Sequence, residues 1–282
     1  MLTQQRMSRR LPSVDDPAMR AHYEAGAEVD RLVSNGERRL ELVRTLELLE
    51  RYLPAPPARI LDVGGGPGVY AEILARQGYE VSLVDPLPLH VGTAEAVSAA
   101  QPDAPFHARV GDARELPDPD DSCDAVLLFG PLYHLTERDD RLRALAEARR
   151  VVRPDGVVLA VGISRFASVF DGLRAGYLLD AEFQHIVERD LREGQHRNPD
   201  DRAGWFTTAY FHHPDELGAE CESVGLSVEA VLGVEGPGAW FPGLWDNEPG
   251  RQATLFAARA VEAEPAMLAA SPHLLVVGRA HY

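Results

Sequence analysis

Four glycines within five positions are the residues of this chain best suited to hold a ligand. Gly64, Gly65, Gly66 and Gly68 follow directly on residues 60–63 (Ile-Leu-Asp-Val), which are typical of a buried parallel strand. Glycine has no Cβ, so the main chain can turn tightly there and come close to a bound molecule. The turn therefore predicts a cradle for a nucleotide-like cofactor.

The glycine turn by itself fits a nicotinamide cofactor. Residues 66–71 satisfy the pattern G-x-G-x-x-G/A, and Asp85 follows Gly68 by 17 positions (85 − 68), near the spacing of a ribose-binding carboxylate. A lone match of this kind is weak evidence. The chain contains no lysine, which excludes the catalytic Tyr/Lys pair of short-chain dehydrogenases. An NAD(P)-dependent oxidoreductase nevertheless stays open as an alternative.

Several motifs in order resemble the class I S-adenosylmethionine-dependent methyltransferases, in particular their small-molecule branch. Residues 61–68 look like the family's first motif, with Asp62 just before the glycines. Residues 111–113 (Gly-Asp-Ala) follow the expected third strand, and residues 147–156 look like the family's helix, turn and fifth strand. Asp155 stands where the family usually has a second glycine, a minor departure because aspartate also tolerates turn geometry.

The resemblance implies S-adenosylmethionine as the cofactor and S-adenosylhomocysteine as its product. It implies that Asp85 accepts hydrogen bonds from both ribose hydroxyls and that Asp112 accepts one from the adenine amino group. Related enzymes use an N-terminal helix as a lid, so Tyr23 and Arg31 in residues 1–53 are also expected to contact the cofactor. The residues expected to contact the cofactor are Asp62, Gly64, Gly65, Gly66, Gly68, Asp85, Pro86, Leu87, Asp112, Ala113, Phe129, Tyr23 and Arg31.

Methyl transfer from a sulfonium is an in-line displacement whose leaving thioether needs no proton, so positioning carries much of the catalysis. The family places the residues nearest the transferred methyl after the fourth strand, here Tyr133 and His134. His134 is a candidate general base because its ordinary pKa is close to neutral, and a structural role is equally open. The residues expected to contact the acceptor are Tyr133, His134, Phe166, Phe170, Trp205 and Tyr210.

Four other histidines compete for a chemical role, namely His185, His196, His212 and His213. Imidazole is a common metal ligand, but no cysteine or carboxylate stands at ligand spacing near the last three. We therefore expect no metal. The two cysteines, Cys123 and Cys221, give neither a zinc spacing nor a disulfide framework and are expected to be structural.

Strand and helix patterns alternate along most of the chain, which predicts an α/β fold with a parallel sheet covered on both faces. We expect helices at residues 68–77, 88–100, 137–152, 214–224 and 253–262. Strands are expected at residues 59–63, 80–84, 106–110, 124–129, 156–163, 226–234 and 273–279. The family resemblance makes this a Rossmann-like three-layer αβα sandwich of seven strands, with an antiparallel last strand between the fifth and sixth.

Two segments depart from this alternation. Residues 1–53 contain apolar positions at helical spacing and are expected to form an N-terminal helical arm or lid. Residues 164–213 lack the rhythm but are rich in aromatic side chains, so we expect an inserted helical cap over the acceptor site. The Rossmann-like domain would then comprise residues 54–163 and 214–282.

Net charge and composition exclude several classes of binding partner and cofactor. A net charge of −16 repels nucleic acid, and the absence of lysine excludes a Schiff-base lysine and a lysine-containing P-loop. No apolar run is long enough for a membrane helix, and no secretory leader is evident, so we expect a cytoplasmic protein. We expect a small-molecule acceptor, leave a homodimer open, and keep a non-catalytic cofactor-binding regulatory protein as the alternative from outside the enzymes.

Overall fold

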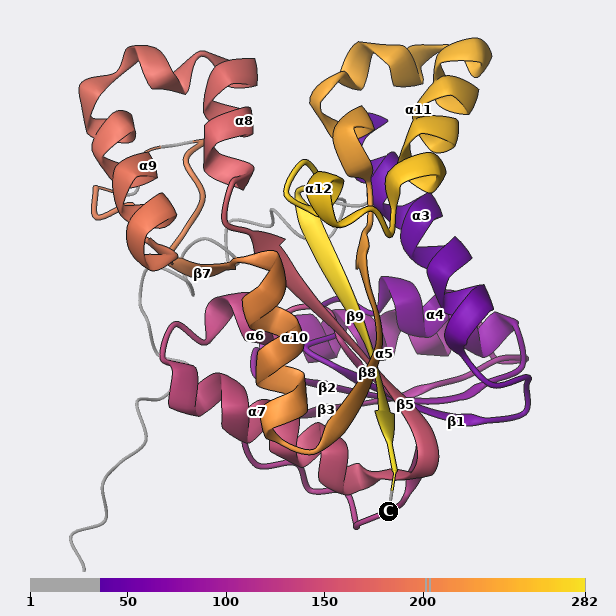
Figure 1. The fold of residues 1–282 in the computed structure, drawn as a ribbon. Helices are drawn as coiled ribbons and strands as arrows, with labels where there is room; N and C mark the ends of the chain where they lie inside the picture. The colour runs from indigo at the N-terminus through magenta and orange to yellow at the C-terminus, as the bar shows by residue number, and fades with distance from the viewer. Residues whose placement is uncertain (1–35, 201, 203, 282) are drawn as a thin grey trace, which may run out of the picture.

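The computed structural model describes residues 36–200, 202 and 204–281, and its centre is a nine-stranded sheet (Figure 1). Five parallel strands lie in the order β3-β2-β1-β4-β5. Their bounds are β1 Arg59–Val63, β2 Glu80–Asp85, β3 His107–Val110, β4 Cys123–Leu128 and β5 Val152–Ser164. The predicted alternation and the Rossmann-like fold are confirmed.

The last strand runs antiparallel, as expected. β9 (His273–Ala280) pairs with β5 on one side and with β8 (Leu226–Gly233) on the other, antiparallel to both. It therefore lies between the fifth strand and the sixth one of the predicted sheet. Asp155 at the start of β5 has φ +61°, so aspartate does occupy the left-handed conformation that the family usually gives to glycine.

The two faces of the sheet are covered by different helices because side chains alternate along each strand. Leu61, Val126 and Val158 belong to one core cluster together with α7 (Arg138–Val151) and α10 (Pro214–Ser223). Ile60, Leu127 and Leu159 belong to the other, together with α3, α4 and α5. The bounds of these are α3 Gly36–Tyr52, α4 Val69–Arg76 and α5 Pro88–Ala100.

The sheet has two more strands than predicted, and both come from the segment expected to be a cap. β7 (Ala209–His212) pairs with the last two residues of β5, and β6 (Gln195–His196) pairs with β7. Ile163 has β9 on one side and β7 on the other, so β7 lies on the side of β5 that β4 occupies lower down. β5 is long enough to offer this edge because β4 ends opposite Ala160.

Helices make up the rest of the cap segment and the C-terminal part. The cap segment contains α8 (Ala167–Ala175), the short helix η1 (Tyr177–Leu179) and α9 (Ala181–Glu193). The remaining short elements are α6 Pro131–His134, η2 Gly236–Trp240, η3 Pro242–Asp246, α11 Glu248–Val261 and α12 Pro265–Leu268. None of the described helices is long and apolar enough to cross a membrane.

Candidate functional site

The glycine turn lies at the carboxyl end of β1, where two of its backbone N–H groups donate hydrogen bonds to residues of β2. The N–H of Gly64 donates to the carbonyl of Val84 at 2.7 Å, and the N–H of Gly66 donates to Oδ2 of Asp85 at 2.9 Å. Gly64 and Gly66 have φ of +72° and +56°, which side chains rarely allow. A Cβ on Gly64 would lie 2.6 Å from Cδ of Pro131, whereas nothing lies within 4 Å of one on Gly66. The turn thus packs closely on one side and is open at Gly66.

Asp85 joins this turn to the next helix. Its Oδ1 accepts from the N–H of Leu87 at 2.9 Å and lies 3.1 Å from Nδ1 of His90, and the residue is only 4% exposed. A carboxylate has about four acceptor positions, so these contacts and the one from Gly66 leave capacity for a further donor. His90 was not predicted, since a histidine inside a helical pattern carries no signal of its own.

Asp62 is a buried carboxylate beneath the turn. It is 0% exposed, and neither of its oxygens has a hydrogen-bond partner among the described residues. Burial and, secondarily, the negative charge of Asp85 raise the pKa of Asp62 to about 7. A Cβ on Gly65 would lie 2.6 Å from its Oδ2, so the carboxylate points at the turn. An unpaired acceptor in this place fits a ligand with a cationic amino group, as S-adenosylmethionine has.

Asp112 lies just beyond β3, as predicted, but it is already paired. Its Oδ1 accepts from the backbone N–H and Nε of Arg114, both at 2.9 Å, and its Oδ2 accepts from Nη2 at 2.6 Å. Partial burial raises the pKa of Asp112, but these bonds outweigh it and hold the pKa below its usual value. Arg114 also reaches Asp140 at 3.1 Å, which fixes the loop that presents Asp112.

The segment after β4 brings together aromatic residues from several elements. The Tyr133 hydroxyl donates to the carbonyl of Phe129 at 2.9 Å, and the Phe129 ring meets Tyr70 edge-on at 5.3 Å. The His134 ring lies 4.7 Å from that of Tyr133 and stacks on Phe206 at 6.5 Å, centroid to centroid. The cap segment therefore reaches His134 through Phe206, an aromatic residue missing from the predicted acceptor set.

The four predicted acceptor aromatics of the cap segment lie in different surroundings. Phe166 meets the His213 ring at 5.7 Å, and Phe170 stacks on Trp240 of η2 at 5.1 Å. Trp205 packs on Phe183 at 5.0 Å, inside an aromatic cluster of the cap segment itself. Phe170 and Tyr210 thus contact residues outside the cap segment, Trp240 of η2 and Arg141 of α7, and the contact of all four with an acceptor stays a prediction.

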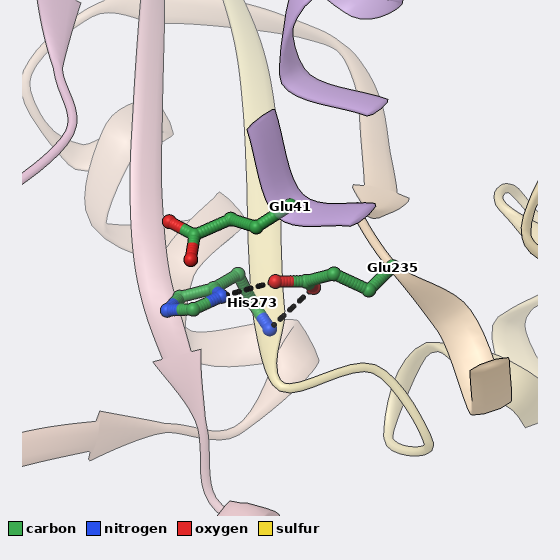
Figure 2. Close-up of side chains that lie close together, drawn as sticks. All are labelled: Glu41, Glu235 and His273. Carbon is green, nitrogen blue, oxygen red and sulfur yellow. Dashed lines mark hydrogen bonds and ion pairs between the residues drawn. The ribbon is translucent and has the colours of Figure 1, made fainter. Parts of the chain in front are cut away.

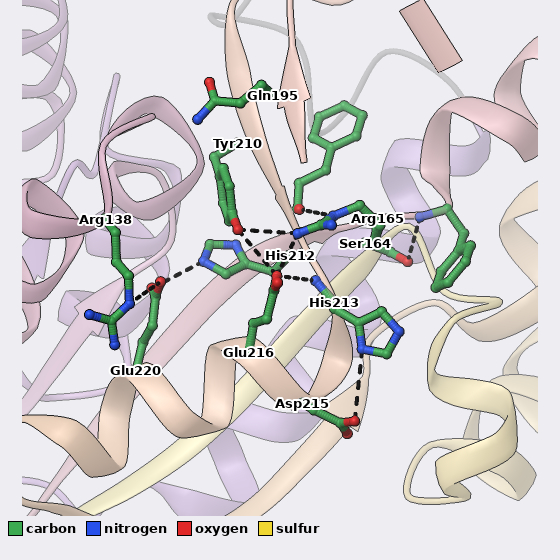
Figure 3. A network of polar contacts seen from close by, with 12 residues as sticks. Arg138, Ser164, Arg165, Gln195, Tyr210, His212, His213, Asp215, Glu216 and Glu220 are labelled. Carbon is green, nitrogen blue, oxygen red and sulfur yellow. Dashed lines mark hydrogen bonds and ion pairs between the residues drawn. The ribbon is translucent and has the colours of Figure 1, made fainter. Parts of the chain in front are cut away.

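Tyr210, the fourth, belongs to a buried polar network (Figure 3). The Arg141 guanidinium lies 3.6 Å from the centre of its ring, and its hydroxyl donates to Glu216 at 3.2 Å. Arg141 also donates to Glu220 at 2.7 Å, which in turn lies 3.3 Å from Nε2 of His212. This network joins β7 to α7 and α10.

Ionisation in the network is strongly shifted. Burial would raise the pKa of Glu220, but His212 and Arg141 lower it to about 2. Burial lowers the pKa of His212, more than Glu220 raises it. A neutral His212 beside an ionised Glu220 is consistent with a structural role, in which the network holds β7 against α7 and α10.

The other histidines of the segment are placed apart. His196 is buried and its Nδ1 lies 2.8 Å from Asp190, while its Nε2 faces the carbonyl of Phe206 at 3.1 Å. His185 is exposed on α9. Within the described part of the chain, His196, His212 and His213 do not form a group able to share an ion.

Five further residues were predicted to contact the cofactor. Leu87 and Ala113 are buried at the ends of β2 and β3, and Pro86 is half-buried between Asp85 and Leu87. Tyr23 and Arg31 lie outside the described residues.

Comparison with known proteins agrees with this geometry. The family described as "Methyltransferase domain" matches residues 61–160. A ubiquinone biosynthesis O-methyltransferase of Azorhizobium caulinodans is 30% identical over 181 residues, which cover 64% of this chain and 63% of that protein. An uncharacterized methyltransferase of Mycobacterium bovis is 37% identical over 110 residues, 39% of this chain and 42% of that protein. The chain thus aligns with less than two thirds of the length of either relative.

Solved structures show the same fold at low sequence identity. An S-adenosylmethionine-dependent methyltransferase from Mesorhizobium loti superposes with a TM-score of 0.59 at 18% identity, covering 85% of this chain and 99% of that one. Another from Methanosarcina mazei gives 0.57 at 17% identity, over 83% and 97%. With the glycine turn and the strand-end aspartates, residues 61–160 are similar to a methyltransferase domain, and the chain has the fold of these S-adenosylmethionine-dependent methyltransferases.

Proposed function

We propose that this protein transfers the methyl group of S-adenosylmethionine to a small-molecule acceptor. The observation that carries the proposal is the grouping of Asp62, Asp85 and Asp112 at the ends of three neighbouring strands, around a glycine turn that is open at Gly66. Ligands of open α/β sheets bind at this edge. When bound, the cofactor supplies an electrophilic methyl group on a sulfonium.

The chain's own residues would hold the cofactor by distinct means. Asp85 would accept from a ribose hydroxyl through the acceptor position that Gly66, Leu87 and His90 leave open. Its hydrogen bonds from Gly66 and Leu87 hold the carboxylate in place for this contact. Asp112, fixed by Arg114, would accept from the adenine amino group. Asp62 would face the cationic amino group of the cofactor. This positive charge would lower the pKa of Asp62, so that its carboxylate would be negatively charged.

An oxygen atom is the acceptor that we favour among oxygen, nitrogen and carbon. The Azorhizobium relative is named as an O-methyltransferase, and the aromatic residue Phe206 packs in the same apolar cluster as Tyr133 and stacks on His134. A planar or apolar acceptor of specialised metabolism, used in the cytoplasm, fits aromatic side chains and an acidic surface. The proposal includes residues 164–213 as a cap over the acceptor site.

One calorimetric experiment tests the cofactor assignment. S-adenosylmethionine, S-adenosylhomocysteine and NADH are titrated into wild type, Asp85→Ala and, as a control, Asp103→Ala on an exposed turn. We expect both sulfur ligands to bind wild type and the control, and Asp85→Ala to bind them at least about 30-fold more weakly, since about 2 kcal/mol of charge-assisted hydrogen bonding is removed. Binding of NADH alone, or unchanged binding by Asp85→Ala, would refute it.

His134 is tested as a base once an acceptor has been identified. A base with the ordinary pKa of histidine makes kcat/KM rise with pH through about 6.5 and then level off. We expect His134→Ala to lose this rise. An active His134→Ala enzyme with the wild-type pH profile removes His134 as the base and leaves it a packing partner of Phe206.

A further inference from the structure

Three metal-ligating side chains from distant parts of the sequence meet at the end of the sheet. Glu41 lies in α3, Glu235 follows β8, and His273 is the first residue of β9. One ligand atom from each lies within 4.8 Å of the other two. Figure 2 shows the two carboxylates and the imidazole directed toward one another. Within the described residues, this is the one such group of three.

The chemistry of the set is that of a mixed oxygen and nitrogen site. Carboxylate and imidazole together suit divalent first-row cations such as Mn²⁺, Co²⁺ and Zn²⁺. Metal–ligand bonds of about 2.1 Å place neighbouring ligand atoms about 3 to 3.5 Å apart. Nδ1 of His273 and Oε1 of Glu235 lie 2.5 Å apart, so an ion would take the place of the proton between them and move them apart by about 0.5 to 1 Å. The half-buried Glu41 carboxylate, whose ligand atom lies within 4.8 Å, would have to approach by about 1 to 2 Å.

Two of the three ligands are held in place by further contacts. Glu235 is 2% exposed, and its Oε1 lies 2.5 Å from Nδ1 of His273. Its Oε2 accepts from the Ser271 hydroxyl at 3.1 Å and from the His273 N–H at 3.2 Å. The Ser271 oxygen accepts in turn from the N–H groups of Glu235 and Gly236, both at 3.1 Å. Outer-shell contacts of this kind orient metal ligands.

The charges of the set suit a cation. A divalent ion is attracted to two carboxylates whose ligand atoms lie within 4.8 Å of each other, and the burial of Glu235 strengthens this attraction because less water screens it. The buried Arg44, one turn along α3 from Glu41, donates from Nε to the carbonyl of Val234 at 3.1 Å and pairs with Glu47 and Glu262.

We propose that Glu41, Glu235 and His273 form a binding site for a divalent cation of the Mn²⁺, Co²⁺ or Zn²⁺ type. The site joins α3 near the beginning of the described chain to β8 and β9 near its end. His273 pairs with Ile163, so the ion lies at the same edge of the sheet as the residues after β4. An ion bound only by the folded chain stabilises it in proportion to the logarithm of its concentration.

This site runs against the expectation of no metal. The ligands stand 194 (235 − 41) and 38 (273 − 235) positions apart, so sequence spacing could not reveal them. The inference does not depend on methyl transfer, because the ion is expected to bind without cofactor or acceptor.

The test is a metal titration of the full chain. After dialysis against EDTA and then metal-free buffer, MnCl₂, CoCl₂ or ZnCl₂ is titrated in by calorimetry, and Co²⁺ absorption reports on its ligands. We expect one equivalent to bind wild type, with at least tenfold weaker binding in Glu41→Gln and His273→Gln. His185→Gln is the matched control, because His185 and Glu188 form an exposed His–Glu pair with 3.5 Å between Nδ1 and Oε2.

Each result of the titration either supports or overturns the metal site. Retention of one-site binding in His185→Gln, with its loss in His273→Gln and Glu41→Gln, supports the site. Circular dichroism and thermal unfolding show whether each variant is folded, and Glu41→Gln changes a half-buried side chain without changing its size. No saturable binding to wild type, or His273→Gln binding as wild type does, overturns the proposal. The titration contains no S-adenosylmethionine, so its failure leaves the proposed function standing.

Discussion

The Asp85 carboxylate accepts a hydrogen bond from the backbone N–H of Gly66 at 2.9 Å, so the end of β2 holds the turn that follows β1. The same carboxylate accepts from Leu87 at the start of α5. One side chain thus fixes the shape of the proposed cofactor site and would also contact the cofactor. These two roles can be separated by stability measurements made without any ligand.

Asp85→Asn is expected to lower the free energy of unfolding by about 1 to 3 kcal/mol, because the amide offers one acceptor oxygen where two buried N–H groups need acceptors. Urea unfolding of the ligand-free protein measures this. Asp103→Asn, on an exposed turn, is expected to change the value by less than about 0.5 kcal/mol. Equal stability of Asp85→Asn and wild type would show that the turn keeps its shape without this carboxylate.

Asp62 makes the folded state sensitive to pH. Its pKa is about 7 in the folded protein and 3.8 ordinarily, so between these values the folded chain holds a proton that the unfolded chain has lost. Stability from this group is therefore complete below about pH 4 and falls as the pH rises to about 7. Asp62→Asn removes the titration, and its stability relative to wild type should rise across this range by a few kcal/mol.

Urea unfolding from pH 4 to pH 8 follows the Asp62→Asn difference, with Asp103→Asn as the control for loss of an exposed carboxyl. A difference between Asp62→Asn and wild type that does not change with pH contradicts the buried, unpaired state of Asp62.

Gly64→Ala tests the closed side of the turn. The added Cβ would lie 2.6 Å from Pro131, and the alanine backbone would have to adopt a φ of +72°. We therefore expect the free energy of unfolding to fall by about 2 to 5 kcal/mol. Gly225→Ala is the matched control: its φ is +89°, but nothing lies within 4 Å of its Cβ, so only about 1 to 2 kcal/mol of backbone strain is expected. Thermal unfolding compares the two, and equal losses would mean that Pro131 simply moves.

Arg141 and Arg138 both approach Glu220, but from different environments. Arg141 is 1% exposed and donates to Glu220 at 2.7 Å, whereas the Arg138 side chain is 58% exposed and 4.0 Å away. Arg141→Met should cost about 3 to 5 kcal/mol, because it leaves a buried carboxylate without its cation. Arg138→Met should cost less than about 1 kcal/mol. Chemical unfolding at pH 7 measures both, and similar costs would show that Glu220 is effectively solvated.

The same pair gives an acid-dependent loss of stability. The pKa of Glu220 falls from 4.5 to about 2 on folding, so its contribution is present above about pH 4.5 and disappears as the pH falls toward 2. Unfolding curves recorded between pH 5 and pH 2.5 should show this loss in wild type and a smaller one in Arg141→Met.

The sequence predicted the sheet well because local pattern decides it. In β4, Ala125 to Leu128 alternate between the two cores, and every residue of the strand is buried, as a continuous apolar run requires. The predicted start of α11 at residue 253 was too late by five positions, since the helix begins at Glu248 behind Asn247. Asn247 caps it by accepting from the N–H of Gly250, a signal that was available but masked by Pro249 and Gly250.

β6 and β7 were not predicted, because each is short and forms through pairing rather than from its own sequence: β7 pairs with the free edge of β5, and β6 pairs with β7. Sequence could likewise not show that Tyr210 lies under Arg141 while Phe206 reaches His134, since both residues belong to the same aromatic-rich stretch. Their roles depend on which neighbour each side chain meets.

The sequence by itself determined the fold family and the positions of the glycine turn, Asp62, Asp85 and Asp112, because a strand, a turn and a strand end are set by residues close together in the chain. The tertiary structure alone decided which of these carboxylates is paired: Asp112 by Arg114, Asp62 by none of the described residues. It also brought Glu41 to Glu235 and His273. Burial and long-range contact set the charge and the partners of a side chain, and neither is written in its local sequence.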